Sequence, residues 1–551
     1  MKKYKINKIL LVIMAILFSC LLQIVNSYAQ PTREWTSFYP ETNTFSSSAA
    51  AMAIDDSGNV YTTGHSEGYN GTVSWNSYTT VKYNSSGVLQ WSANFTGETS
   101  GGKFPNDIAV DNDGNVYVTG YAHRTASDFD FCTIKYNSDG LQQWLRYYDN
   151  PTHNEDQARK IAIDNAGNIY VSGFSNLCVF SCQIYTILKY NRSGNLIWSR
   201  SYGLGTSSGT DIGDMKVDNN CNIYITGMNY YNAVTIKYDS SGNQLWVNTF
   251  SNSGQLSNAL SIIIDSENDV IITGQSPYGM NFASCFTIKY NINGTQEWLK
   301  LINPPSTSNG NWKSTYVDTD NFNNVYISGV YFNNSSRKIF TIKYSSIGDS
   351  LWTYFNSDTA FPRPTYLNID KDNNILLTGS IVVFLNQLYI SQIVILMLDT
   401  EGTLKWKEIT NYPFMGSEVT GIKTDTINNI LLSGSSDAKM IVTKYSFHTG
   451  IKAIQNNIPR ENRLYQNYPN PFNTTTKIKF DLYEGELQNI IKAKLVLYDI
   501  LGREIETLVD NKLCQGTYEL IWNSGNFSSG IYFYKITTKY YSETKKMLLI
   551  K

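Results

Sequence analysis

The sequence predicts an all-β chain in which an eight-bladed β-propeller is followed by a small Ig-like β-sandwich. A ten-residue phrase recurs eight times, and its final glycines lie 47 to 56 residues apart. A second phrase, which ends in tryptophan, follows seven of these copies. Near residue 450 the repeat stops, and short alternating apolar segments separated by glycine turns continue to the end of the chain.

The first phrase predicts two strands joined by a tight turn. It reads DDSGNVYTTG at 55–64 and returns as DNDGNVYVTG at 111–120 and DNAGNIYVSG at 164–173. In the second copy the apolar run 108–110 ends at an Asp-x-x-Gly-Asn turn, and 116–120 forms the returning strand. Glycine supplies the positive φ that such a turn requires.

The second phrase predicts two more strands. In CTIKYNSDGLQQW, residues 133–136 alternate in polarity, 137–140 form a turn, and a strand carries Trp144. Four antiparallel strands in about 50 residues make one small sheet that is not stable alone. Radial packing of such sheets buries both faces of each, which is the propeller arrangement.

The two ends of the repeat region predict a closed ring. The eighth copy reaches 440–445 and a turn at Gly450, but no tryptophan strand follows it. A tryptophan strand without a preceding copy lies at 34–39, and it is similar to 90–95. We expect the N-terminal strand to complete the last blade, which leaves no exposed sheet edge.

The paired phrases, D-x-x-G-N-x-Y-x-x-G and K-Y-N-x-x-G-x-x-x-W, resemble the SBBP type of bacterial β-propeller repeat from about residue 34 to 450. The name of that family implies seven blades, so a seven-bladed ring is the alternative to the eight units counted. The G-x-x-x-W half is also similar to the Trp-docking repeat of quinoprotein dehydrogenases. The turn at 138–140 is similar to the Asp-box of sialidases. We interpret both similarities as the result of a common type of turn.

After a polar linker at 451–463, residues 464–551 carry the segments YPNPFN, LYDILGREI, GTYELIW, SSGIYFY and KKMLLIK in that order. This stretch resembles the type A C-terminal sorting domain of the type IX secretion system. The resemblance implies that 464–551 bind the secretion machinery and direct passage through the outer membrane. The protein is then attached to the surface or released. Thr474, Gln515 and the longer connection at 483–491 depart from the family pattern.

Residues 1–29 read as a signal peptide, with a basic start, an apolar run at 9–25 and small residues before a cleavage site after Ala29. An uncleaved anchor and a lipoprotein box at 17–20 are the rival interpretations. The predicted domains are therefore a signal peptide at 1–29, a propeller at 30–450, a linker at 451–463 and a sorting domain at 464–551. The apolar stretch 381–398 contains four polar residues and is in register with two strands of the seventh blade, so it is not read as a membrane span.

Charge and cysteine content restrict the function further. The formal net charge is -2, with no basic stripe, which excludes nucleic acid as an expected partner. Six cysteines lie outside the signal peptide, too few for a disulfide scaffold in a chain of this length. Cys178 and Cys182 share one loop and either pair or stay unpaired, and Cys514 is alone in the last domain.

The sequence assigns no catalytic, cofactor-binding or metal-ligating residue. The four histidines are His65, His123, His153 and His448. His65 and His123 follow repeat glycines and are interpreted as polar residues on the rim of the ring. The stretch 111–115 imitates a calcium loop but has Ala122 where the loop needs a glutamate, so turn chemistry explains it. The eight arginines of the propeller region are scattered over different blade positions, unlike a sialidase cluster.

Aromatic residues in the variable loops are the best candidates for ligand contact, since propeller loops commonly carry function. They are Tyr69, Trp75, Trp312 and the Tyr230–Tyr231 pair, and packing onto their own blade is the alternative for each. The leading hypothesis is an exported binding protein with a glycan or protein ligand on the propeller loops. An extracellular carbohydrate-active hydrolase or lyase with a site in the channel, and a structural or adhesion component, are the alternatives. Carboxylates clustered in the channel would favour the enzyme.

Overall fold

The computed structural model describes residues 31–551 with short gaps. The gaps are 41–44, 70–73, 98, 100, 125–127, 179–181, 204–208, 279–281, 304–310, 334–336, 357–360, 363–365, 386–387, 411–417, 427, 447–451, 456–458, 484–489 and 525–526. The predicted signal peptide, 1–29, lies outside the described residues. The chain divides into two compact units, one spanning Arg33–Tyr445 and the other including Ser446–Lys551.

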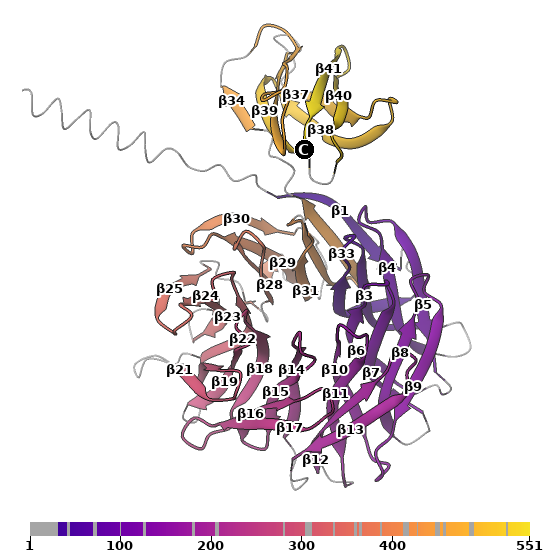
Figure 1. The fold of residues 1–551 in the computed structure, drawn as a ribbon, viewed down its shortest axis with the longest axis vertical. Helices are drawn as coiled ribbons and strands as arrows, with labels where there is room; N and C mark the ends of the chain where they lie inside the picture. The colour runs from indigo at the N-terminus through magenta and orange to yellow at the C-terminus, as the bar shows by residue number, and fades with distance from the viewer. Residues whose placement is uncertain are drawn as a thin grey trace, which may run out of the picture. The chain divides into compact units, whose positions relative to one another are not determined.

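The first unit is a ring of eight antiparallel sheets, which confirms eight blades rather than seven (Figure 1). In each blade the first strand lies innermost and the fourth outermost. The first four blades consist of β2 (Ser46–Ile54), β3 (Val60–Tyr69), β4 (Ser74–Tyr83) and β5 (Leu89–Phe95); β6 (Lys103–Val110), β7 (Val116–His123), β8 (Phe129–Tyr136) and β9 (Gln142–Tyr148); β10 (Asp156–Ile163), β11 (Ile169–Asn176), β12 (Gln183–Tyr190) and β13 (Leu196–Tyr202); and β14 (Thr210–Val217), β15 (Ile223–Asn229), β16 (Asn232–Tyr238) and β17 (Gln244–Phe250).

The remaining blades follow the same order, except that the inner strand of the seventh is split. The two pieces, β26 and β27, both pair with β28. These blades consist of β18 (Asn258–Ile264), β19 (Val270–Tyr278), β20 (Phe282–Tyr290) and β21 (Gln296–Ile302); β22 (Asn311–Thr319), β23 (Val325–Phe332), β24 (Arg337–Tyr344) and β25 (Ser350–Phe355); β26 (Phe361–Pro362), β27 (Tyr366–Ile369), β28 (Ile375–Leu385), β29 (Leu388–Leu398) and β30 (Leu404–Ile409); and β31 (Glu418–Thr424), β32 (Ile430–Ser436) and β33 (Lys439–Ser446), completed by β1 (Thr32–Tyr39).

The N-terminal strand closes the ring, as the sequence predicts. β1 pairs with β33 and is the outermost strand of the eighth blade (Figure 1). The Oγ1 atoms of Thr36 and Thr443 lie 3.1 Å apart across this pair. The indole N–H of Trp35 donates to the carbonyl of Ser85 in the first blade at 3.1 Å. The first and last blades are therefore tied together by the two ends of the repeat region.

Each interface between blades is built around a repeat tryptophan. The Trp91 indole N–H donates to the carbonyl of Ser138 in the next blade at 2.9 Å. A Cβ atom on Gly140 would lie 2.5 Å from the Trp91 ring, so glycine is required both for this contact and for its φ of 81°. The same hydrogen bond to the next blade is made by Trp35, Trp144, Trp198, Trp246, Trp298 and Trp352.

The Asp-x-x-Gly-Asn phrase is a self-contained turn. The Asp111 carboxylate accepts the backbone N–H groups of Asp113 and Asn115, the Asn115 amide, and the Tyr117 hydroxyl at 3.0 Å. Gly114 has a φ of 76°. The resemblance to a calcium loop is thus explained by hydrogen bonds within the turn.

A β-bulge in the inner strand explains the glycine that ends the first phrase. The register between β6 and β7 shifts between Pro105 and Asp107, and equivalent shifts occur in β2, β10, β14, β18, β22 and β31. Opposite the bulge, a Cβ atom on Gly120 would lie 2.1 Å from the Phe104 carbonyl. The bulge therefore requires glycine at this position.

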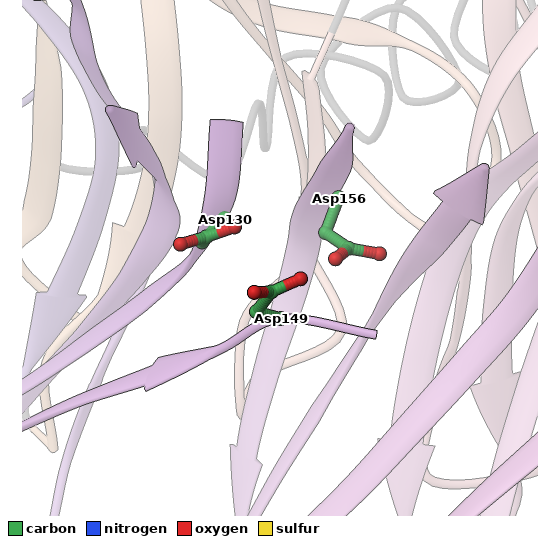
Figure 2. A group of neighbouring side chains, drawn as sticks. All are labelled: Asp130, Asp149 and Asp156. Atoms are coloured by element: carbon green, nitrogen blue, oxygen red, sulfur yellow. The ribbon is translucent and has the colours of Figure 1, made fainter. Parts of the chain in front are cut away.

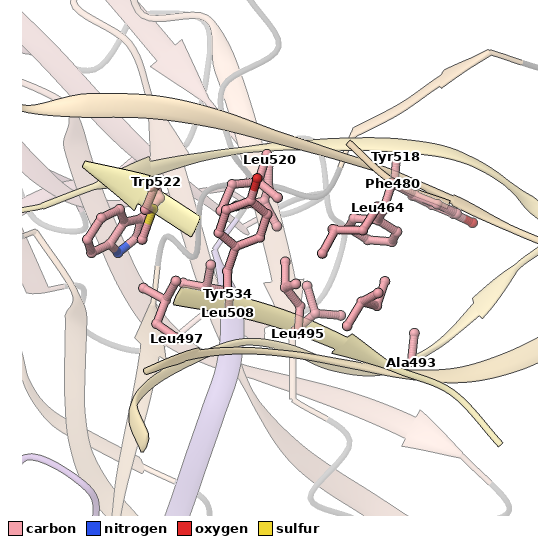
Figure 3. Close-up of a cluster of buried hydrophobic side chains, with 14 of the residues drawn as sticks. Leu464, Phe480, Ala493, Leu495, Leu497, Leu508, Tyr518, Leu520, Trp522 and Tyr534 are labelled. Carbon is pink, nitrogen blue, oxygen red and sulfur yellow. The ribbon is translucent and has the colours of Figure 1, made fainter. Parts of the chain in front are cut away.

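The second unit is a sandwich of two four-stranded sheets. One sheet has the order β34 (Lys452–Gln455), β39 (Gly516–Asn523), β36 (Thr475–Leu482) and β35 (Arg463–Leu464), and the other has the order β38 (Glu504–Cys514), β37 (Ile490–Tyr498), β40 (Gly530–Thr537) and β41 (Ser542–Leu549). Its core lies between the sheets and includes Trp522, Leu520, Tyr534 and Leu495 (Figure 3). The expected linker differs from the structure, because β34 lies within it and pairs with β39.

The structure confirms one expectation about an individual segment and decides between two alternatives that the sequence left open. The apolar stretch 381–398 lies in β28 and β29 of the seventh blade. The described part of the chain contains no helix with the length and apolarity to cross a membrane. Cys178 and Cys182 form a disulfide, while the side chain of Cys514 lies outside the described residues.

Candidate functional site

The strand directions give the propeller two chemically different faces. We call the face that carries the Asp-x-x-Gly-Asn turns and the Asn-x-x-Gly turns the turn face. The other, which we call the variable-loop face, carries the connections between second and third strands and those between successive blades. The turns of the turn face that the structure describes share one pair of backbone hydrogen bonds, whereas the variable-loop face differs from blade to blade. Ligand-specific chemistry is therefore sought on the variable-loop face and in the channel.

The Tyr230–Tyr231 pair stands exposed on the variable-loop face, at the tip of the β15–β16 hairpin. The two side chains are 51% and 48% exposed, and their rings meet edge-on with centroids 4.1 Å apart. Tyr230 has a φ of 63°, which is uncommon for a residue with a bulky side chain. The Tyr230 N–H donates to Gly209, and the Tyr231 carbonyl accepts from Ser257 at 2.8 Å. Backbone contacts thus hold two exposed rings in place.

The other aromatic residues proposed for ligand contact are not exposed in the same way. Trp312 packs on its own blade against Tyr331, Phe340 and Phe355, with centroids 4.8 to 5.7 Å apart. It is part of the core and is removed from the candidates. The side chains of Tyr69 and Trp75 lie outside the described residues.

Among the described residues, the group of side chains spaced to hold a metal ion contains no histidine. The His65 ring stacks on Phe104, and its Nδ1 lies 3.0 Å from the Lys103 carbonyl. The His123 ring packs on Phe129 at 3.8 Å. His448 lies outside the described residues. His65 and His123 therefore contact aromatic neighbours, in keeping with their interpretation as rim residues.

Carboxylates occur in the channel, where the inner strands of different blades face one another. Asp107, Asp214 and Asp318 belong to β6, β14 and β22. Each carboxylate accepts a backbone N–H from the inner strand of the following blade. Ile161 donates to Asp107 at 3.0 Å, Ile262 donates to Asp214 at 3.3 Å, and Ile369 donates to Asp318 at 2.9 Å. These carboxylates thus join neighbouring blades as well as lining the channel.

Lysines compensate part of this charge. Burial would raise the pKa of Asp214, but Lys216, 2.9 Å away, and Lys160 hold it below its ordinary value. Burial raises the pKa of Asp107 despite the opposing effect of Lys160. Burial likewise raises the pKa of Asp318 to about 6, against the backbone N–H of Ile369. Burial therefore raises the pKa of Asp107 and Asp318, whereas the lysines lower the pKa of Asp214.

A compact group of three carboxylates lies on the variable-loop face between the second and third blades (Figure 2). Asp130 is in β8, Asp149 follows β9, and Asp156 begins β10. One oxygen from each lies within 4.8 Å of the others. Oxygen donors in this number and spacing are able to hold a cation.

A stretch of each unit matches a known protein family. Residues 466–551 match the model described as a secretion system C-terminal sorting domain, and 90–124 match the one described as a beta-propeller repeat of the SBBP type. The chain therefore carries an SBBP β-propeller repeat and a C-terminal sorting domain. The sorting domain is of the type IX secretion system and implies export to the cell surface or the medium.

Solved structures similar to this repeat protein share little sequence with it. Prolyl oligopeptidase B from Galerina marginata is 10% identical over 76% of this chain and 57% of its own, with a TM-score of 0.39. Drosophila Plexin A, in complex with Semaphorin 1b, is 7% identical over 76% and 87%, with a TM-score of 0.36. A gluconolactonase from Xanthomonas campestris is 10% identical over 48% and 82%, with a TM-score of 0.28. No curated protein matches the chain.

In the sorting domain, the family motifs contact one another. Tyr534, from SSGIYFY, donates its hydroxyl to the Tyr465 carbonyl at 2.9 Å and accepts the Asn467 N–H at 2.7 Å. Phe472, from YPNPFN, packs on Trp522 of GTYELIW at 5.6 Å. The motifs are therefore parts of one folded core.

Sequence reasoning missed the three-carboxylate group. Asp130, Asp149 and Asp156 belong to no repeated phrase, and they come from three different strand ends. Asp130 lies at the start of the third strand of its blade, Asp149 follows the fourth strand, and Asp156 starts the next blade. The directions of these strands place all three ends on one face of the propeller. Aligning the copies and inspecting these three positions would have found the group.

Proposed function

We propose that this propeller is an exported binding protein that recognises a glycan or a protein with its variable-loop face. The Tyr230–Tyr231 pair is the observation that carries the proposal. Tyrosine offers a large amphipathic surface with few rotatable bonds, and exposed rings stack on sugar rings or apolar side chains. Because the pair is held by backbone hydrogen bonds, little conformational freedom is lost on binding.

The test is a glycan, polysaccharide and surface-protein array probed with the purified protein and with the double variant Tyr230→Ala, Tyr231→Ala. Binding to any retained ligand is expected to fall at least tenfold in the double variant. Phe322→Ala is the matched control, because Phe322 is 73% exposed but lies on the turn face, in the turn that begins at Asp320 and has Asn323 at the usual glycine position. Equal loss in the control, or no loss in the double variant, contradicts recognition by this pair.

Hydrolysis or lysis of a polysaccharide in the channel is the second candidate function. Several carboxylates lie in the channel, and this is the feature expected of an enzyme. Burial raises the pKa of Asp318 to about 6, which suits a general acid. Release of reducing ends from polysaccharides, abolished in Asp318→Asn, would support this candidate. Binding without product formation would leave the binding function in place.

Delivery of the protein is proposed to use both ends of the chain. Residues 1–29 would direct it to the periplasm as a signal peptide, and 464–551 would engage the secretion machinery. Deletion of 464–551 should retain the propeller in the periplasm, as measured by fractionation and by surface protease accessibility. Normal surface delivery of the shortened chain would contradict this assignment.

A further inference from the structure

We propose that Asp130, Asp149 and Asp156 form a calcium-binding site on the variable-loop face, at the junction of the second and third blades. This site is separate from the Tyr230–Tyr231 pair and does not depend on the ligand that the pair recognises.

The position of the three residues is fixed by the fold. Asp130 and Asp156 lie in strands β8 and β10, and Asp149 directly follows β9. In Figure 2 the Asp149 carboxylate lies between those of Asp130 and Asp156. Two blades therefore supply ligands to one point, and a bound cation would tie their ends together.

The carboxylate oxygens are not all used by the protein. Asp130 is only 6% exposed, and its pKa is raised by burial and by the charges of Asp149 and Asp156, with no hydrogen bond among the causes. The Oδ1 atom of Asp149 is buried and has no hydrogen-bond partner among the described residues. A buried carboxylate without a partner is costly, so these oxygens point to a cation that satisfies them.

Asp156 is already oriented for such a role. Its two oxygens accept the side-chain amide and the backbone N–H of Asn150, at 2.7 and 2.8 Å. Each carboxylate oxygen has a second lone pair, so these bonds hold the group without exhausting it. Metal-ligating carboxylates are commonly oriented by hydrogen bonds from outer groups, and Asn150 and Ser175 have that position around Asp156.

Nearby positive charge does not balance the group. Two basic side chains act on it: Arg124, which opposes the raised pKa of Asp130, and His153, whose Nδ1 lies 2.7 Å from Asp149 Oδ2 and whose pKa this contact raises. Asp128 adds to the negative potential. Both Arg124 and His153 are exposed, so their charge is screened by water.

Calcium is the cation that this geometry favours. All three ligands are hard oxygen donors, and Ca²⁺ accepts irregular sets of six to eight oxygens at about 2.3–2.6 Å. The three oxygens lie within 4.8 Å of one another, close enough for one cation at a Ca–O distance of about 2.4 Å to reach all of them. Mg²⁺ requires shorter bonds of about 2.0–2.1 Å and near-octahedral geometry. Since Asp149 is 28% exposed, water can supply the remaining ligands.

The affinity should match an exported protein. With three protein carboxylates and several waters, we expect a Kd of about 10⁻⁴–10⁻³ M, the range of extracellular calcium modules. The experiment is equilibrium dialysis of the purified full chain against Ca²⁺ from 10 μM to 10 mM, after treatment with a chelator. One calcium per chain is expected, bound at least tenfold more tightly than Mg²⁺.

The matched variants are Asp149→Asn and Asp139→Asn. Asp149→Asn should weaken calcium binding at least tenfold, whereas Asp139→Asn, an exposed carboxylate on the turn face, should bind as the wild type does. Arg124→Gln leaves the ligands intact and should tighten binding by removing a positive charge, so the proposal stays testable even where a ligand variant fails to fold. Absence of binding up to 10 mM, equal affinity for Mg²⁺, or normal binding in Asp149→Asn would overturn the proposal.

Discussion

Replacing Lys289 with methionine should destabilise the propeller far more than the same change at equivalent lysines. In most blades this lysine lies over the tyrosine of the first phrase, as Lys343 does over the Tyr326 ring at 5.2 Å. In the fifth blade the tyrosine position holds Ile271, and the ammonium group instead lies 3.0 Å from both Asp265 and Asp269.

The expected magnitude follows from burial. The side chains of Lys289, Asp265 and Asp269 are only 4%, 0% and 10% exposed, so removal of the lysine leaves two buried carboxylates uncompensated. Breaking a buried ion pair in this way costs about 3–5 kcal/mol. Methionine preserves most of the apolar volume, so little of that loss comes from packing. For a unit of about 410 residues, this corresponds to a fall in Tm of roughly 3–6 °C.

The matched control is Lys343→Met in the neighbouring blade. There Asp320 lies 3.9 Å from the ammonium group and keeps hydrogen bonds from Tyr326 and Asn324 when the lysine is lost. A cation–π contact and one hydrogen bond are worth about 1–2 kcal/mol together. We expect less than half the effect of Lys289→Met.

The assay is differential scanning calorimetry of the purified chain between pH 4 and 8. Burial would lower the pKa of Lys289, but its bonds to Asp269 and Asp265 raise it, so the wild-type ammonium group stays charged across this range. In Lys289→Met the two carboxylates can protonate as the pH falls, and the deficit should shrink towards pH 4. Asp269→Asn, which restores the residue found in most copies, should recover part of the loss. Equal deficits in the two lysine variants, or a deficit that is independent of pH, would refute the reasoning.

Three further predictions concern the repeat, the channel and the ring closure. Gly140→Ala should lower the stability of the propeller by at least about 1–2 kcal/mol, measured by Tm, because its φ of 81° and the Trp91 ring both oppose a Cβ atom; an unchanged Tm would contradict the docking geometry. In Asp318→Asn the propeller should gain up to about 3 kcal/mol of stability at pH 8 and nothing near pH 4. Burial raises the pKa of this carboxyl from 3.8 to about 6, so the folded wild-type chain loses stability as the pH rises between those two values. Calorimetry at both pH values tests the sign of the effect. Deletion of residues 32–39 should expose the edge of β33 and produce concentration-dependent association in sedimentation experiments, whereas a stable monomer would show that closure by β1 is dispensable.

The eight blades could be predicted because their signals are local and repeated. A turn aspartate, a turn glycine and a docking tryptophan each act within a few residues of the chain or at a fixed offset in the next copy. Even the long-range contact of Trp35 followed from counting, since the eighth copy lacked one strand and the N-terminus supplied it.

The candidate sites were less predictable because they depend on what different blades bring together. Asp130, Asp149 and Asp156 belong to no common phrase, and only the strand directions show that they meet. The sequence predicted ligand contact for both the tyrosine pair and Trp312. Only the folded structure distinguishes them, because the tyrosines are exposed and Trp312 packs on Phe340. Sequence composition also gave no sign that the channel carboxylates accept backbone N–H groups from the next blade.

The two faces of the propeller differ in how freely their side chains can change. On the turn face, the turn that holds Gly140 receives the indole N–H of Trp91 from the preceding blade, so a substitution there disturbs two blades at once. On the variable-loop face, the Tyr230–Tyr231 hairpin is held through backbone atoms, which leaves its side chains free to vary without loss of the fold. The repeated turns therefore stabilise the ring from one face, while the other face carries the side chains that differ between blades. This asymmetry explains why both the exposed tyrosine pair and the acidic group occur on the variable-loop face.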